Sequence, residues 1–266
     1  MQKRSKSDAI KIHDLDDFSR MRSAGRVAAQ ILDDITEFVF PGQLTSEIDR
    51  QINRMIDDAG ATSATIGYRG YQHASCISVN HVVCHGIPSN KRLRFGDILN
   101  IDVTVIINGW FGDTSRMYIA GQPNRKSERL IQVTHDALMK GIEQIKPGNT
   151  FGDIGYAIQS YVESHRMSVV RDFCGHGLGK VFHAPPNVLH FGKAGSGTVL
   201  ETGMFFTVEP MVNLGRAETK TLPDNWTAVT RDKSLSAQFE HSVGVTENGV
   251  EIFTLSPSDN FFPKVG

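Results

Sequence analysis

The sequence predicts an α+β protein with antiparallel sheet covered by helices, built as a pseudo-two-fold pair of similar halves. Residues 100–115, NIDVTVIINGWFGDTS, have the alternation and the turn of a β-hairpin. The order helix, Pro-Gly, helix occurs twice, with the Pro-Gly breaks at 41–42 and 147–148. The motif VVCHGIP at 82–88 is echoed by KVFHAPP at 180–186. Repeated features in the same order favour an internal duplication over chance.

The repeat places the two halves at roughly 15–122 and 123–255, and no Ser-, Pro- or Gly-rich linker separates them. The strand around Asp102 has its counterpart in FFTVEPMV at 205–212, an apolar run that carries Glu209. We therefore expect one domain over 1–266, with a flexible segment at 1–10.

Composition bounds the class of protein. With 266 residues, 39% of them hydrophobic, the chain can bury a substantial core, and its net charge of −1 favours neither nucleic acid nor an anionic membrane as a partner. The sequence has neither an apolar run long enough to span a membrane nor a signal peptide at its start. Three cysteines without a CxxC motif are typical of reduced thiols. We expect a cytoplasmic protein.

Apolar spacings of three and four predict four helices. The first covers about 15–38 and the second about 45–60, on either side of the first Pro-Gly break. The third covers about 130–145. A fourth begins at Thr150, where Asp153 three residues later resembles a capping box.

The hairpin explains why two aspartates occur in an apolar stretch. Asn108-Gly109 is the strongest short-range signal for a two-residue turn, and a turn centred there sets Thr104 opposite Asp113. Asp102 and Asp113 then share one face as diagonal neighbours, roughly 7–8 Å apart. The other face is the predicted core, formed by Ile101, Val103, Val105, Ile107 and Trp110.

The aspartate face has two interpretations. An antiparallel sheet often leaves one face in water, and this reading needs no ligand. Alternatively the carboxylates share a cation, because two adjacent carboxylates repel unless a proton or a metal lies between them. The hairpin alone does not decide between the two.

The second half adds three residues that favour the cation. His176 lies in GHGLG, Glu209 in TVEP and Glu240 in AQFEHS, which makes four carboxylates and one imidazole in all. Such an oxygen-rich donor set suits Mn, Fe, Co or Zn, and four carboxylates balance two divalent ions. Each acid taken alone is more often a surface residue. GHGLGK lacks the spacing of a phosphate loop, and neither HExxH nor GxSxG occurs.

At this point the chain resembles the type I methionine aminopeptidases, from its first helix to about Phe253. The motifs that carry the resemblance occur in one order: GYRGY, SCISVN, VVCHGIP, NIDVTV, WFGDTSRMY, CGHGLGKVFHAPP, FTVEPM and AQFEHSV. The resemblance implies the "pita-bread" fold shared with creatinase, in a single catalytic domain. Neither a zinc-binding extension nor a helical insertion between Glu209 and Glu240 is present, so the chain looks like the minimal bacterial or organellar form.

The resemblance also implies a reaction. The family removes the N-terminal methionine from nascent polypeptides whose second residue is small, by attack of a metal-bound water. By similarity, Asp102 binds one ion, Asp113 and Glu240 bridge both, and His176 and Glu209 complete the shell of the other. Glu209 is then the general base, and the free amine of the substrate coordinates the ion of Asp102. His183 would stabilise the oxyanion, and His85 would bind the amide beyond the scissile bond.

The same correspondence implies further sites and partners. The methionine pocket would be lined by Tyr68, Tyr71, Cys76, Phe182 and Trp226, and the substrate would also be bound by His85 and His183. Thr65 departs from the family, in which cysteine is common at this position. A monovalent cation would bind near Asn80, Val82 and Ser236. The expected partners are the N-terminal peptide of nascent proteins and, transiently, the ribosome, with the enzyme acting as a monomer and without direct nucleic-acid or membrane binding.

Two alternatives stay open at the level of sequence. A prolidase or aminopeptidase P resembles this chain in the catalytic half, but carries a large additional N-terminal domain. A non-catalytic binding protein of the same fold would have lost metal ligands, whereas all five candidates are present here.

Overall fold

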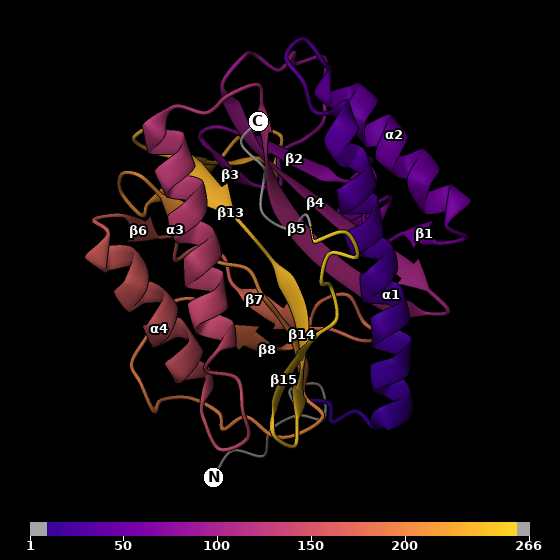
Figure 1. Cartoon of the computed structure of the whole chain (residues 1–266), viewed down its shortest axis with the longest axis vertical. Helices are drawn as coiled ribbons and strands as arrows, with labels where there is room; N and C mark the ends of the chain where they lie inside the picture. The colour runs from indigo at the N-terminus through magenta and orange to yellow at the C-terminus, as the bar shows by residue number, and fades with distance from the viewer. Residues whose placement is uncertain (1–9, 260–266) are drawn as a thin grey trace.

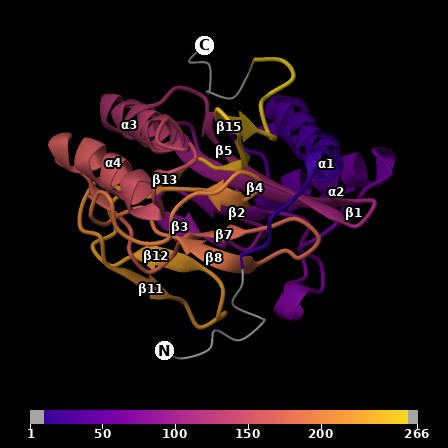
Figure 2. The same cartoon turned by 90° about the horizontal axis from the view of Figure 1, so that it is seen from below.

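The computed structural model of the chain describes residues 10–259, so the flexible segment expected at 1–10 lies almost wholly outside the described residues. Helices α1 and α2 lie beside one part of the strands, and α3 and α4 beside another (Figure 1). Seen from below, all four helices lie on the same side of strands β7, β8, β11 and β12 (Figure 2). This mixture of helices and antiparallel strands confirms the predicted α+β class.

The four helices form where the apolar spacings predicted them. Their bounds are α1 Leu15–Asp34, α2 Thr45–Asp58, α3 Arg125–Ile142 and α4 Phe151–Ser164. Helix α1 continues into a 3-10 helix, η2 Ile35–Phe38. The helical segment therefore ends at the predicted residue 38, with its last turn in the tighter 3-10 form. The capping box of α4 is present, with Asp153 accepting hydrogen bonds from both the backbone and the hydroxyl of Thr150. No helix within 10–259 combines the length and the apolar character that a membrane crossing requires.

The hairpin has the predicted register. It consists of β4 Asp97–Ile107 and β5 Trp110–Ala120, and Thr104 lies opposite Asp113 as expected. Asn108 and Gly109 have φ values of 50° and 79°, the left-handed pair that a type I′ turn requires. The two aspartates therefore share one face of the hairpin.

The strands are short apart from this hairpin, and every pairing is antiparallel. One sheet has the order β1-β4-β2, with β5 paired to β4, and another the order β15-β14-β9-β7-β8. Two smaller sheets are β13-β10-β6 and β11-β12-β3, and the second of these joins β3 of the first half to strands of the second. The remaining bounds are β1 Thr62–Ser63, η3 Tyr68–Gly70, β2 Cys76–Val79, β3 Val82–Cys84, β6 Ser168–Val169, β7 Gly175–Gly177, β8 Ala184–Val188, β9 Phe205–Val208, β10 Met211–Asn213, β11 Thr219–Thr221, β12 Ala228–Thr230, β13 Ser236–Gln238, β14 His241–Thr246 and β15 Gly249–Ile252.

The strand expected over 205–212 is interrupted at the residue of interest. Strand β9 ends at Val208 and β10 begins at Met211, so Glu209 lies in the break. Pro210 has no N–H to donate to a neighbouring strand, which accounts for the interruption. The break leaves Glu209 outside a regular ladder.

Two large apolar clusters hold the helices to the sheets. One packs α1 and α2 against β4, and includes Ile101, Val103 and Val105 of the predicted core face. The other packs α3 and α4 against the strands of the second half. Helix α1 crosses β5 closely at Gly112, where any side chain would overlap the backbone of Ala24 and Gly25.

A buried ion pair joins α1 to the hairpin, and its carboxylate also binds the C-terminal segment. Asp33 of α1 pairs with Arg116 of β5, and both side chains are almost fully buried. The same carboxylate accepts hydrogen bonds from the hydroxyls of Ser256 and Ser258. Burial alone would raise the pKa of Asp33, but the bonds from Arg116 and the serines hold it below its ordinary value.

We predict that Asp33→Ala lowers the free energy of unfolding by about 3–5 kcal/mol, because it leaves the buried Arg116 without this carboxylate. Since folding lowers the pKa of Asp33, its contribution is complete above about pH 4–5 and fades as the pH falls through the folded-state pKa. Urea titrations at pH 7 and pH 3 measure the difference. Asp34→Ala, at an exposed neighbour, is the control and should change stability by less than about 0.5 kcal/mol. Equal effects of the two substitutions would contradict the role of Asp33.

Candidate active site

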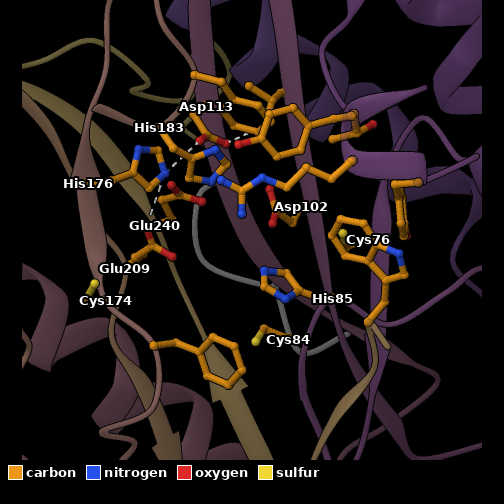
Figure 3. A pocket seen from close by; sticks show the side chains of 18 of the residues that line it. Cys76, Cys84, His85, Asp102, Asp113, Cys174, His176, His183, Glu209 and Glu240 are labelled. Atoms are coloured by element: carbon orange, nitrogen blue, oxygen red, sulfur yellow. Dashed lines mark hydrogen bonds and ion pairs between the residues drawn. The ribbon is translucent and has the colours of Figure 1, made fainter. Parts of the chain in front are cut away.

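All five residues predicted to bind metal line one cavity of about 890 Å³. The labelled side chains of Asp102, Asp113, Glu209 and Glu240 lie around the same space as the His176 ring (Figure 3). Asp113, His176 and Glu240 are buried, with exposures of 3%, 8% and 2%. The structure thus brings together residues from four distant segments of the chain.

A single backbone bridge places Glu240 beside the hairpin. The Glu240 N–H donates to the Ser115 carbonyl at 3.0 Å, and the Thr114 hydroxyl donates to the Glu240 carbonyl at 2.7 Å. Just beyond, the Ser242 hydroxyl donates to the Asp113 carbonyl at 2.6 Å. These three hydrogen bonds join the second half to β5 at the position where Asp113 projects into the cavity.

The His176 ring is oriented by its own backbone neighbourhood. Its Nδ1 lies 3.1 Å from the Gly177 carbonyl, an arrangement in which Nδ1 carries the proton and donates it. Nε2 then faces the carboxylates, 3.5 Å from Asp113 and 3.7 Å from Glu209. Burial opposes a charge on this ring, but the contact with Asp113 and the charge of Glu209 raise the pKa of His176 to about 9. A nitrogen presented in this way is a suitable metal ligand.

The donor set fits divalent cations. One ligand atom each of Asp113, His176 and Glu240 lies within 4.8 Å of the others. Burial, and then the neighbouring negative charges, raise the pKa of Asp102 and Glu240 well above the ordinary range. Burial also raises the pKa of Glu209 to about 7. Buried carboxylates that oppose one another's ionisation are stabilised when cations lie between them.

Four polar residues that the sequence analysis did not single out hold these ligands in place. The Thr104 hydroxyl donates to Asp113 at 2.7 Å, and the Thr207 hydroxyl donates to Glu209 at 2.7 Å. Gln238 contacts the other oxygen of Glu209 at 3.3 Å, and His190 accepts the Glu209 N–H at 3.0 Å. Thr207 and Gln238 stand two positions before Glu209 and Glu240, so the period of a strand could have suggested that they share a face with them.

The predicted substrate residues line the same cavity, walled largely by aromatic rings. Tyr71 lies edge-on to Trp226 with ring centroids 4.9 Å apart, and Tyr68 contacts Phe182 at the same distance. Tyr68 also stacks on His183 at 5.2 Å. The remaining predicted members, His85 and Cys76, line this cavity as well.

Two histidines of the cavity, His183 and His85, and its three thiols are uncharged at neutral pH. Burial, and then the charge of His176, lower the pKa of His183 to about 4. Burial likewise lowers the pKa of His85. All three cysteines are free, as expected, and line the cavity, where burial raises the pKa of each thiol. These two histidines and the thiols therefore add no charge to the wall of the cavity.

The proposed monovalent site lies elsewhere. Asn80, Val82 and Ser236 do not line the catalytic cavity, although the Ser236 N–H donates to the Asn80 carbonyl at 2.9 Å. Cation binding there stays a prediction.

One wall of the cavity is anchored by Asp49 of α2. Its carboxylate accepts from the Ser75 N–H at 2.9 Å and from the Ser75 hydroxyl at 2.8 Å, and contacts His73 Nδ1 at 3.1 Å. Thr65 donates its hydroxyl to the His73 carbonyl at 2.7 Å. Tyr71 in turn donates to the Ser75 carbonyl at 2.9 Å. The loop from Thr65 to Ser75 is thus fixed by a carboxylate outside the cavity.

Known proteins resemble this chain over most of its length. A model of metallopeptidase family M24 matches residues 19–247. Methionine aminopeptidase from Rickettsia prowazekii is 56% identical over 96% of this chain and 98% of its own length. A crystal structure of methionine aminopeptidase from that organism matches with a TM-score of 0.92, over 93% of this chain and 100% of that chain.

Two solved structures of lower sequence identity show how far the structural similarity extends. Methionine aminopeptidase from Thermotoga maritima matches with a TM-score of 0.91 at 37% identity, over 92% of this chain and 99% of that one. Prolidase from Pyrococcus furiosus matches with a TM-score of 0.73 at 22% identity, and this chain covers 65% of it. The second likeness shows the fold alone, and together they confirm the expected pita-bread architecture.

We predict that Asp49→Ala loosens the wall of the cavity while leaving the fold intact. Losing bonds to a buried carboxylate costs about 1–3 kcal/mol, so exchange of the Ser75 amide hydrogen should quicken by about tenfold or more. Hydrogen exchange followed by mass spectrometry measures it. Asp57→Ala, at an exposed position of the same helix, is the matched control. Unchanged protection of 65–76 in the Asp49 variant would contradict the anchor.

We predict that Mn²⁺ added to metal-free protein raises the melting temperature. Ligand at a hundred times its Kd adds about 2.7 kcal/mol, which corresponds to roughly 5–10 °C for a chain of this size. Glu240→Gln should lose most of that gain, yet should be no less stable than the wild type without metal, because a repelling charge is removed. The exposed Glu247→Gln serves as control. A full metal-induced shift in Glu240→Gln would refute its assignment as a ligand.

Proposed function

The chain belongs to metallopeptidase family M24 and, within it, to the methionine aminopeptidases; on this premise we propose that it removes the N-terminal methionine from nascent polypeptides whose second residue is small. The observation that carries the proposal is the convergence of four carboxylates and one imidazole at the inner end of a cavity walled by aromatic rings. A flexible, polarizable thioether suits such walls.

Asp102, Asp113, His176, Glu209 and Glu240 would hold two divalent ions, drawn from Co, Mn, Fe or Zn. Asp113, two residues before Ser115 of the Ser115–Glu240 bridge, and Glu240 would serve as ligands to both ions. When bound, divalent ions make water nucleophilic at neutral pH and polarise the scissile carbonyl.

Glu209 is the proposed general base. One of its carboxylate oxygens accepts from the Thr207 hydroxyl and the other contacts Gln238, so the group is held in a fixed orientation. In that orientation it takes a proton from the attacking water and delivers it to the leaving amine. Burial raises the pKa of Glu209 to about 7. A pKa near neutral pH suits a group that must both accept and return a proton.

Two neutral histidines complete the proposed machinery. His183 keeps one ring proton at neutral pH, and would donate it to the carbonyl oxygen as negative charge develops there. His85 would hydrogen-bond the peptide beyond the scissile bond. Its ring lies edge-on to Trp226 with centroids 6.1 Å apart, so it borders the proposed methionine pocket.

The setting of the reaction is also a proposal. Free thiols suit the reducing cytoplasm, where nascent chains emerge, and we propose a monomer that works transiently at the ribosome. Asn80, Val82 and Ser236 are the proposed holders of a monovalent cation.

A peptide assay tests the function. With Mn²⁺ or Co²⁺, the protein should release methionine from Met-Gly-Met-Met, and neither from Met-Leu-Met-Met nor from an N-acetylated peptide. Preferential cleavage before proline would favour a prolidase. The absence of release with any divalent metal would favour a binding protein of this fold.

We predict that Glu209→Gln lowers kcat by about 10²–10⁴-fold at saturating metal, because the amide cannot accept the proton. Turnover of Met-Gly-Met-Met measures the change, and circular dichroism confirms that the variant is folded. Glu201→Gln, at an exposed position, should keep full activity. A near-normal kcat in Glu209→Gln would exclude it as the base.

A further inference from the structure

The wall of the catalytic cavity carries an arginine that has no ionic partner among residues 10–259. Apart from the five proposed metal ligands, the Asp and Glu, Lys and Arg side chains that line it are Arg69 and Asp172. The Asp172 carboxylate accepts a hydrogen bond from the Thr219 hydroxyl at 2.5 Å. The Arg69 guanidinium makes neither a hydrogen bond nor an ion pair with any residue from 10 to 259, and the residue is exposed.

The local structure places this guanidinium against an aromatic ring. Arg69 lies in the short turn η3 with φ of 50°, a left-handed conformation that is uncommon for residues other than glycine. Gly67 and Gly70 on either side have φ of 84° and 90° and make the turn possible. The guanidinium carbon lies 5.3 Å from the centre of the Tyr68 ring, within the range of a cation–π contact.

The same tyrosine connects Arg69 to the reacting centre. Tyr68 stacks on His183 at 5.2 Å, with the two ring planes 25° apart. Two spacings set an upper limit on the distance from the guanidinium to the His183 ring. They are the spacing from Arg69 to the Tyr68 ring and the spacing from that ring to His183. An extended peptide advances about 3.3–3.6 Å per residue, so the guanidinium lies at most about three substrate residues from the His183 ring.

We propose that Arg69 is a specificity-determining residue that binds an acidic side chain at the third or fourth position of the substrate peptide. The inference rests on the proposed function, and adds a preference for the peptide downstream of the small second residue. A carboxylate is the ligand that a planar guanidinium recognises best, through two parallel hydrogen bonds. Contact with the Tyr68 ring restricts the guanidinium before the peptide arrives, which reduces the conformational entropy lost on binding.

Peptides of one length isolate the charge. We would compare kcat/KM for Met-Ala-Xaa-Ala-Ala-amide and Met-Ala-Ala-Xaa-Ala-amide, with Glu, Gln or Lys as Xaa; the amide removes the terminal carboxylate. The Glu peptide of at least one series should be preferred over its Gln counterpart by about two- to fivefold at low salt, as is typical of an exposed ion pair, and the Lys peptide should be the poorest. The preference should shrink at 0.5 M salt.

Variants assign the preference to the residue. Arg69→Gln should erase the ratio of Glu to Gln, and Arg69→Glu should invert it in favour of Lys. The matched control is Arg171→Gln: this exposed arginine also lies 5.3 Å from an aromatic ring, that of Phe191, but does not line the cavity. Its variant should keep the wild-type ratio.

The outcomes separate the two proposals. If no peptide is cleaved, the proposed function fails. If all are cleaved and the Glu and Gln peptides of both series react equally, or Arg69→Gln keeps the wild-type ratio, only the role of Arg69 is overturned. A uniform rise in KM for every peptide would likewise mark Arg69 as a structural residue and overturn the recognition of charge.

Discussion

The backbone bridge between Ser115 and Glu240 is the contact on which the arrangement of the site depends. It is an isolated antiparallel bridge, not part of a named pair of strands, yet it connects the hairpin of the first half to the second. Through it, the carboxylates of Asp113 and Glu240 project into one space. The hydroxyls of Thr114 and Ser242 reinforce the junction from either side. Both side chains are fully buried, so the hydrogen bond of each hydroxyl is also what satisfies it.

Without its cations, the site is energetically unfavourable for the folded protein. Four carboxylates are withdrawn from water and placed near one another, and each opposes the ionisation of the others. The surrounding fold must hold them against this repulsion, which it does through Thr104, Thr207 and the His190 contact to the Glu209 backbone. Rigid positioning of this kind lets a site bind metal without a large rearrangement, and keeps the general base in a defined orientation.

The sequence was sufficient where local chemistry decides the structure. Asn108-Gly109 fixed the register of the hairpin, and with it the shared face of Asp102 and Asp113, because a two-residue turn leaves no freedom in the pairing. The capping box at Thr150 was equally local. Contacts between residues far apart in the sequence could not be predicted from such local patterns. Neither the pairing of β3 with β12 nor the reach of Asp49 from α2 to Ser75 has a local signature, because both arise from the packing of whole elements. Pro210 did carry a signal, since a residue without an N–H cannot continue a central strand.

The distribution of charge shows how such a cavity can select a peptide. Burial keeps the three thiols and His183 uncharged, so these groups contribute shape and hydrogen bonds to the wall. Four carboxylates and two divalent ions would cancel in formal charge at the inner end. What then distinguishes one peptide from another electrostatically is the charge left on the wall beyond the reacting centre. On that wall Asp172 is already engaged by a hydroxyl, whereas Arg69 is held over a tyrosine with its hydrogen-bonding groups free of protein partners among the described residues. With the catalytic charges balanced, the guanidinium of Arg69 is a group on this wall that can bind a charged side chain of the peptide.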